Sequence, residues 1–453
     1  MRCDSADVRR KSTMRHVWRA TTTSAVIAGL LFVAGISLRR RTESPPDLGA
    51  RPRQEENRSP KAEEMSPKAV VNHPKADKMD SQTLKNHSRR ILEGSAQVGA
   101  ACSAPWSSAC FDRGRCVDAD GLPKLTIYAY DFNCSNALSS EIMAREKAIG
   151  RYRSVPIAAI KILREIALEK GILVDRAEDA CIIVYAVTVR SRCVSDTSGW
   201  NGGRNHLLID FNDEPREHFG ALYNSKAMWA EVNMQSRYFR FGYDIAVPFP
   251  PKVTFDDLAD ILPTRRKYLA TFKGQLYLSK AGVEERNAIR QVGVSANSSD
   301  VVVLESCQES HAEHLLPENV ELCQNLKEES LQHDYNDLMN TKFALVPAGR
   351  SPATYRLGEA MSAGAIPVFF HNGFVKPYPD RIPWRLFSFT FSLEDAPVVI
   401  DILRAVPKRK LFFMQGLALH FYEKYFSNGM DGIVETTLAT LEDRLTFQSE
   451  RVR

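Results

Sequence analysis

Residues 343–370 read FALVPAGRSPATYRLGEAMSAGAIPVFF. The two ends, FALVP and IPVFF, are short apolar runs of the kind that form buried parallel strands. Between them the pattern predicts a helix over about 352–363, because Pro352 suits a first helical position and Gly364 a C-terminal stop. The stretch therefore predicts a strand–loop–helix–strand unit of an α/β sheet.

The loop of this unit, Gly349-Arg350-Ser351, has the chemistry of an anion site. We expect Ser351 to cap the helix, whose first N–H groups and dipole favour negative charge. Arg350 supplies a cation that grips phosphate, and Gly349 lets the backbone approach closely. The loop therefore predicts a site for the diphosphate of a nucleotide.

Arg356 and Glu359 lie three positions apart, so a helix places them on one face. A carboxylate one turn into the helix can bind the vicinal hydroxyls of a ribose, and the arginine can share the diphosphate charge. The alternative is an ordinary surface ion pair. Spacing alone does not decide between the two, and the chain has neither GxGxxG nor GxxxxGK[ST].

The surrounding chain repeats the alternation of strands and helices. Two such sets are separated by the proline-rich stretch 247–263, which predicts two Rossmann-like domains with ligands at the carboxyl ends of the strands. Strands are expected at 125–130, 180–187, 265–274 and 300–306, with another after the glycine-rich turn in 199–211. Helices are expected at 155–169, 283–292 and over most of 399–446, with a break at Gly429 and Gly432.

Composition indicates a globular protein larger than one ordinary domain. The chain has 453 residues, of which 44% are hydrophobic and 25% charged. A formal net charge of +5 is small for this size and does not favour nucleic-acid binding. The D-x-D at Asp118–Asp120 falls in a cysteine-rich segment, where a polar turn explains it better than a metal site.

The N-terminal region predicts a membrane anchor followed by a stem. Residues 20–38 carry no charge and are long enough to span a bilayer, although a cleaved signal peptide is the alternative. We expect residues 1–19 to form a cytosolic tail. Residues 39–100 are polar, with SPKA, SPKA and HPKA at seven-residue intervals, and predict a disordered stem.

Cysteines and sequons agree with a lumenal body. Eight of the nine cysteines follow the predicted span, and an even set favours disulfides, although the connectivity is not readable from sequence. Buried free thiols are the alternative for Cys181 and Cys193. Four N-x-S/T sequons also follow the span, at Asn57, Asn86, Asn133 and Asn297.

The stretch at 343–370 resembles the exostosin family of glycosyltransferases, whose pattern is FCLVPxGxxxxSxRxxEALxxGCxPVxxxxG. Ala365 replaces the usual cysteine and Thr354 the usual serine. The matching positions are Phe343, Leu345–Pro347, Gly349, Arg356, Glu359, Ala360, Gly364, Pro367, Val368 and Gly373. Further blocks look like exostosin segments in the same order: CFDRGRC (110–116), WNGGRNHLLIDF (200–211), FGYDIAVPFP (241–250), RRKYLATFKGQLYL (265–278), DYNDLMNTKFALVPAGR (334–350) and FYEKYFS (421–427).

The resemblance implies a GT-B architecture, with two facing Rossmann-like domains and a cleft between them. It also implies inverting transfer from a UDP-sugar to a glycan or polysaccharide, with glucuronic acid as the best guess. The likeness is to the glucuronyl-transferring half of heparan polymerases, which carry a second transferase domain after this one. This sequence shows no counterpart of that second domain, so we do not expect a bifunctional polymerase. The alternatives are a non-catalytic subunit that binds glycan or stabilises a partner transferase, and a carbohydrate-binding surface protein.

The expected domains follow these boundaries: a tail at 1–19, an anchor at 20–38, a stem at 39–100, a cysteine-rich cap at 101–121, an acceptor domain at 122–260, a nucleotide-sugar domain at 261–428 and a C-terminal helix at 429–453. We expect a single-pass type II protein of the Golgi membrane. Its expected partners are the nucleotide sugar, the glycan acceptor and another transferase in a homo- or hetero-oligomer.

The site residues expected for the nucleotide are Lys273, Gly349, Arg350, Ser351, Arg356 and Glu359. For Lys273 the alternative is an ordinary surface lysine. The catalytic base is expected from the first domain, at His206 or Asp131, with Asp210 as a rival; a structural role for His206 is equally consistent with its glycine-rich turn. Cationic side chains and the helix dipole replace a divalent metal, so no cofactor is expected.

Overall fold

A computed structural model describes most of the chain after residue 101. The described residues are 102, 104, 106–130, 155–187, 199–212, 216, 219, 222–278, 282–308, 312–370 and 373–450. They lie within one compact unit, residues 89–453. No described helix is long and apolar enough to cross a membrane, and the predicted span at 20–38 and stem at 39–100 lie outside the described residues.

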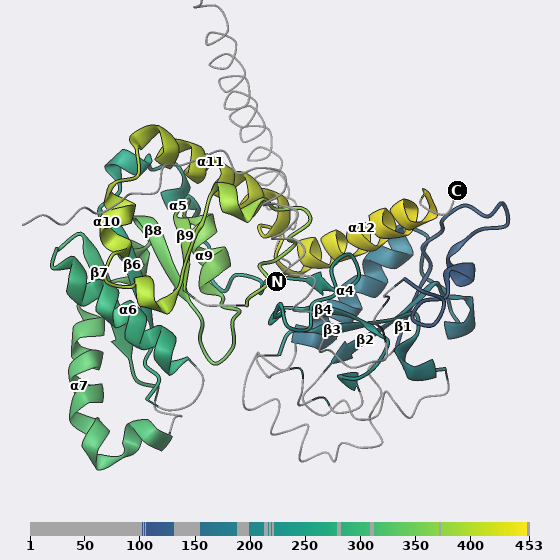
Figure 1. Cartoon of the computed structure of the whole chain (residues 1–453), viewed down its shortest axis with the longest axis horizontal. Helices are drawn as coiled ribbons and strands as arrows, with labels where there is room; N and C mark the ends of the chain where they lie inside the picture. Colours follow the sequence, from purple (N-terminus) through teal and green to yellow (C-terminus); the bar gives the residue numbers. More distant parts are fainter. Residues whose placement is uncertain are drawn as a thin grey trace, which may run out of the picture. The chain divides into compact units, whose positions relative to one another are not determined.

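The first lobe is built on a five-stranded parallel sheet in the order β1-β2-β3-β4-β5. Its strands are β1 (Ile127–Ala129), β2 (Ile182–Val187), β3 (His206–Asp210), β4 (Met228–Glu231) and β5 (Ile245–Ala246). All described positions of β2 and β3 are buried, as expected for strands of an α/β sheet. Helix α4 (Val155–Glu169) packs on β1 and β2, and α12 (Gly429–Glu450) lies along α4 (Figure 1).

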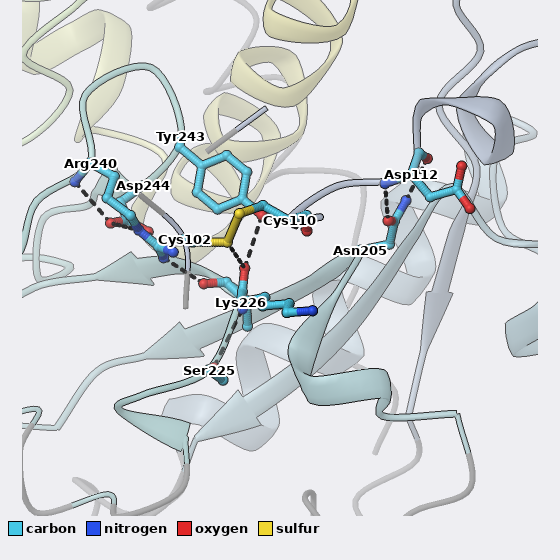
Figure 2. The surroundings of a disulfide bond; sticks show 10 residues. Cys102, Cys110, Asp112, Asn205, Ser225, Lys226, Arg240, Tyr243 and Asp244 are labelled. Carbon is cyan, nitrogen blue, oxygen red and sulfur yellow. Dashed lines mark hydrogen bonds and ion pairs between the residues drawn. A yellow bond between two sulfur atoms is a disulfide. The ribbon is translucent and has the colours of Figure 1, made fainter. Parts of the chain in front are cut away.

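A cysteine-rich cap is closed on itself by the disulfide Cys102–Cys110 and is fastened to this lobe by the disulfide Cys116–Cys181. The Tyr243 hydroxyl donates to the Lys226 carbonyl at 2.9 Å, beside the first disulfide (Figure 2). Asn205 accepts from the backbone N–H of Asp112 at 2.6 Å and donates to its carbonyl at 2.9 Å. The expectation of disulfides is thus confirmed for these four cysteines, and the free-thiol alternative is wrong for Cys181. Cys134 and Cys193 lie outside the described residues.

The D-x-D of the cap is a polar turn, as expected. The Asp118 carboxylate accepts from the backbone N–H groups of Asp120 at 3.0 Å and Leu122 at 2.9 Å. These bonds use the carboxylate to close the turn at Gly121, whose φ is +75°.

The second lobe holds another five-stranded parallel sheet, in the order β10-β9-β8-β6-β7. Its strands are β6 (Tyr268–Gln275), β7 (Val301–Ser306), β8 (Thr341–Pro347), β9 (Ile366–Phe370) and β10 (Phe389–Phe391). Its helices are α5 (Asp256–Ala259), α6 (Val283–Ala296), α7 (Pro317–Leu331), α8 (Tyr335–Leu338), α9 (Arg356–Ser362), α10 (Val399–Arg404) and α11 (Lys408–Tyr425) (Figure 1). A disulfide, Cys307–Cys323, ties the end of β7 to α7.

The prediction of two parallel-sheet α/β domains is confirmed, but the predicted helix over 352–363 is wrong at its start. Helix α9 begins at Arg356, and its N-cap position is Tyr355. Ser351 therefore does not cap it. Residues 348–355 form a loop instead, in which the N–H of Gly349 donates to the carbonyl of Ser351 at 2.9 Å.

Helix α12 links the two lobes through one buried arginine. Arg444 donates to the carbonyl of Tyr243 in the first lobe at 2.8 Å and pairs with Asp380 of the second lobe at 3.0 Å. A second link joins Gln235 and Phe374 in an isolated antiparallel bridge. Since Gln235 follows β4, the second link holds the carboxyl side of the first sheet against the segment after β9.

Candidate functional site

The strand order of the second sheet marks where a ligand is expected. The chain runs from β6 outward to β7, then returns to place β8 on the other side of β6. Open parallel sheets bind ligands beside the carboxyl ends of the strands at such a switch point. The segments that leave β6 and β8 at this edge lead to Gly282 and Gly349 respectively.

Arg356 spans this switch point inside the protein. Its side chain donates to the carbonyl of Leu345 on β8 and to that of Thr271 on β6, both at 2.9 Å. Only 5% of Arg356 is exposed. Its guanidinium therefore fixes the spacing of the two strands and adds positive charge beneath the site.

Glu359 is buried beside Arg356, and Tyr335 connects the two. The Tyr335 hydroxyl donates to Glu359 Oε2 at 2.6 Å and accepts from Arg356 Nη1 at 3.2 Å. Burial raises the pKa of Tyr335 to about 12, so the hydroxyl keeps its proton near neutrality. The alternative of a surface ion pair between Arg356 and Glu359 is therefore wrong.

Lys252 brings a further cation to this carboxylate. Its Nζ lies 4.2 Å from the centre of the Tyr355 ring, which stacks on Phe249 with centroids 4.3 Å apart. Burial lowers the pKa of Lys252, and the charge of Glu359 acts in the opposite direction. The segment that joins the lobes thus packs on the residues that precede α9.

Arg286, in the first turn of α6, is the least satisfied cation at the switch point. Only 7% of it is exposed, and its Nε and Nη1 have no hydrogen-bond partner among the described residues. The guanidinium lies over the rings of Phe272, at 4.7 Å, and Tyr277, at 5.2 Å. A buried donor pair without acceptors is costly unless a ligand supplies them.

The charges at this edge reinforce one another. Burial lowers the pKa of Arg286, and the nearby Arg356 guanidinium lowers it further, against the opposing effects of Tyr277 and Glu305. Arg356 lies 5.5 Å from the Phe272 ring, on which Arg286 also packs. Two desolvated guanidiniums that share one ring favour an anion between or beside them.

Gly349 lies directly against Arg286. A Cβ on Gly349 would come 3.2 Å from the Tyr277 hydroxyl and 3.7 Å from Arg286 Nη2. A Cβ on Gly282, whose φ is +92°, would come 2.5 Å from the Gly349 carbonyl oxygen. Position 282 therefore needs glycine, the space at Gly349 is tight, and the two backbones meet beside the guanidinium.

The remaining residues expected for the nucleotide fall into two groups. Arg350 is exposed and Ser351 half-buried, both in the loop that Gly349 begins. Lys273 is directed elsewhere: its Nζ donates to the carbonyls of Ser330 and His333 at 2.8 Å each. These bonds satisfy the C-terminal end of α7, which explains Lys273 without a phosphate.

The carboxyl edge of the first sheet carries a buried acidic pair. Asp210 and Glu231 end adjacent strands, and both are fully buried. Burial raises the pKa of Asp210 well above its usual range, and the neighbouring Glu231 charge raises it further. Just beyond β4, Asn233 accepts from the backbone N–H of Ala353 at 3.3 Å, so this edge adjoins the loop that carries Gly349.

His206 lies at the opposite end of β3 from Asp210. It is fully buried, its Nδ1 lies 2.9 Å from the Arg204 carbonyl oxygen, and its ring packs on Trp200 at 4.7 Å. The structure therefore does not bring His206 to the edge that adjoins residue 353. Asp131, the other expected base, lies outside the described residues.

The burial of His206 gives a pH prediction. Burial lowers its pKa to about 4, below the ordinary value of about 6.5. Between these values the unfolded chain binds a proton that the folded chain does not, so stability falls as pH drops. We expect a loss of up to about 3 kcal/mol from this residue. Urea titrations at several pH values should show a shallower acid limb for His206→Gln; an unchanged slope would contradict the assignment.

Sequence reasoning did not find Arg286, Tyr335 or Lys252. Arg286 lies in a predicted amphipathic helix, where an arginine normally faces solvent. The sequence feature that points to Arg286 is Gly282, just before that helix. Tyr335 lies within the exostosin-like segment 334–350, but nothing in its spacing points to Glu359, which is 24 residues away.

Comparison with known proteins agrees with the sequence resemblance. The Exostosin GT47 domain model matches residues 122–406, more than half of the chain. Exostosin-1 of Drosophila melanogaster is 27% identical over 391 residues, which cover 82% of this chain and 49% of that protein. Exostosin-1b of Danio rerio is 30% identical over 271 residues, covering 56% and 35% respectively.

A glycosyltransferase from Rickettsia africae ESF-5 aligns with 71% of this chain and 90% of its own, at 11% identity and a TM-score of 0.36. That score is too low to carry an argument. The chain spans about half the length of the Drosophila relative, or less for the other. On the family match, with its two parallel-sheet domains, the chain is a member of the exostosin GT47 family of glycosyltransferases.

Proposed function

We propose that this glycosyltransferase moves a sugar, glucuronic acid by preference, from a UDP-sugar to a glycan or polysaccharide with inversion at the anomeric carbon. In a GT-B arrangement the second lobe would bind the nucleotide and the first lobe the acceptor. One observation supports this proposal most strongly. At the switch point of the second sheet, the buried Arg286 guanidinium has two nitrogen donors, Nε and Nη1, without a hydrogen-bond partner among the described residues.

Each residue of the switch-point site then has a role. Arg286 and Arg350 would bind the diphosphate, and the close backbones at Gly349 and Ser351 would admit it. Glu359 would bind the ribose hydroxyls, exchanging part of its contact with Tyr335. Arg356 would stabilise the departing diphosphate by its charge while its hydrogen bonds hold β6 and β8.

Inverting transfer also needs a base that removes the proton of the acceptor hydroxyl. The base must touch the acceptor, and the amino-edge position of His206 disfavours it. Asp131, two residues after β1 in the sequence, is the candidate that we retain from the sequence prediction. No divalent cation is proposed, because the two guanidiniums supply the charge.

A second candidate function is that of a non-catalytic subunit that binds glycan or supports a partner transferase. The observation that favours it is that His206 and Asp210 are both fully buried, so neither reaches an acceptor in this conformation. We further propose that the protein is anchored in the Golgi membrane with its catalytic part in the lumen, in a homo- or hetero-oligomer.

A donor screen of the full chain separates these candidates. We expect release of UDP from one UDP-sugar when acceptor oligosaccharide is present, and a fall in kcat of at least about 100-fold for Asp131→Asn, as for loss of a general base. Asp118→Asn, in the cap turn, is the control and should keep normal turnover. UDP binding without turnover on any donor would favour the subunit, and no UDP binding would reject the proposed transfer.

A further inference from the structure

A pocket lies beside β10, the edge strand of the second sheet. Its volume is about 330 Å³, within the range of small-molecule sites. Its walls come from the loop after β9, the 3₁₀ turn Trp384–Leu386 with the residues after it, and helix α11. The lining residues are Lys376, Arg385, Ser388, Phe389, Thr390, Lys410 and Met414.

Every charged side chain that lines this pocket is a cation. Lys376 is half-buried, and Arg385 and Lys410 are exposed, so the pocket opens to solvent. Within the part of the chain that the structure describes, none of the three forms an ion pair. Other arginines of the same lobe do: Arg381 pairs with Asp443, and Arg404 with Asp300.

Helix α11 adds to the positive potential. Its first turn reads Lys408-Arg409-Lys410 and contains no acidic residue. Cations at a helix N-terminus oppose the helix dipole, which favours anions there. A bound anion beside Lys410 would offset this unfavourable arrangement.

Lys376 is the deepest cation of the pocket. Its Nζ donates to Thr390 Oγ1 at 2.9 Å and lies 4.7 Å from the centre of the Phe369 ring. The charged groups that line the pocket with it are Arg385 and Lys410, and no carboxylate does. Burial lowers the pKa of Lys376 to about 8, so its charge is lost just above neutral pH.

The uncharged lining matches one kind of anion better than others. Ser388 and Thr390 offer hydroxyls, while Phe389 and Met414 offer an apolar wall. A pyranose presents hydroxyls and an apolar ring face, and a uronic acid adds one carboxylate. The open side would let the rest of a chain continue into solvent.

We propose that this pocket binds an acidic sugar unit of a glycan chain, with its carboxylate on Lys376, Arg385 and Lys410. The identity of the ligand rests on the proposed glycan acceptor, whereas the pocket lies on its own set of residues, distinct from the switch-point site. The site holds the chain during transfer and takes no part in the chemistry.

Binding of a hyaluronan hexasaccharide to the full chain tests the proposal, with chitohexaose as the uncharged control. We expect the acidic oligosaccharide to bind at least about tenfold more tightly than chitohexaose, since each 1.4 kcal/mol is tenfold. The variant Lys376→Ala/Arg385→Ala/Lys410→Ala should lose that difference while its UDP affinity stays within twofold. Lys424→Ala, near the other end of α11, removes a cation outside the pocket and should change neither.

A pH series gives a readout that loss of structure would not mimic. Lys376 is charged below about pH 8 and neutral above it. Affinity for the hexasaccharide should therefore fall between pH 7 and 9 in the wild type and stay flat in Lys376→Arg. If hexasaccharide affinity depended on pH equally in the wild type and in Lys376→Arg, Lys376 would not have this role.

The remaining outcomes are also decisive. Equal hexasaccharide binding by wild type and triple variant would reject the pocket as the site. If the triple variant lost binding to phosphatidylserine vesicles but still bound the hexasaccharide like the wild type, the pocket would be a membrane contact. That result would overturn the proposal. Hexasaccharide binding to a chain that binds no UDP would keep this inference and reject the proposed transfer, so the two failures are distinguishable.

Discussion

Replacing Arg286 by glutamine should reduce the affinity for UDP by at least about 100-fold. Two charge-assisted hydrogen bonds, worth roughly 1.5–3 kcal/mol each, would be lost with the guanidinium. Without nucleotide the variant should be as stable as the wild type or more so, because a desolvated cation with two unpartnered donors has been removed. Calorimetric titration with UDP and thermal unfolding measure the two effects.

Arg290→Gln is the matched control. Arg290 lies one turn further along α6 and forms an ion pair with Glu305 at 2.6 Å. The Arg290→Gln variant should bind UDP as tightly as the wild type. If Arg286→Gln binds UDP as tightly as the wild type, the guanidinium does not touch the nucleotide; if it binds weakly but is also unstable, its role is in the fold.

Replacing Arg216 by methionine should strongly destabilise the first lobe. The Nε and Nη2 of Arg216 donate to Glu231 at 2.8 and 2.6 Å, Asp244 lies 3.9 Å away, and the side chain is 1% exposed. Arg216→Met leaves the buried Glu231 carboxylate without its cation, whereas Asp244 keeps its ion pair with Arg240 at 2.7 Å. Such a loss typically costs about 3–5 kcal/mol. Urea titration should show this loss in the first lobe.

Two comparisons test this interpretation. Arg176→Met removes an arginine from a solvent-exposed pair with Asp179 and should leave the urea midpoint unchanged. The double variant Arg216→Met/Glu231→Met should recover part of the loss, because no unpaired charge of that pair remains buried. A loss below about 1 kcal/mol for Arg216→Met would mean that water or a rearranged side chain replaces the pair.

The sequence predicts the sheet architecture well, because buried parallel strands are written as continuous apolar runs. ACIIVYAV predicts β2 within two residues, and the helical spacing at 155–169 coincides with α4. The start of α9 is missed, since Pro352 is compatible with both a loop and a first helical turn. Local pattern does not distinguish these states.

The candidate site is predicted less completely, because its determinants are contacts between distant segments. Glu359 and Arg356 are found by spacing, but the Tyr335 hydroxyl that joins them comes from another helix. The glycine-rich turn before His206 suggests an active-site loop, whereas Gly203 is there because a Cβ would lie 2.7 Å from the Ala227 backbone nitrogen. Sequence alone does not separate glycines needed for packing from those near a ligand.

A crystal structure of the chain soaked with UDP would show directly whether the switch point of the second sheet binds the nucleotide. We expect diphosphate density beside Arg286 and Gly349, at the carboxyl ends of β6 and β8, with the ribose next to Glu359. Density for UDP at any other place, or a guanidinium of Arg286 turned away from it, would contradict the assignment of the nucleotide site to this switch point.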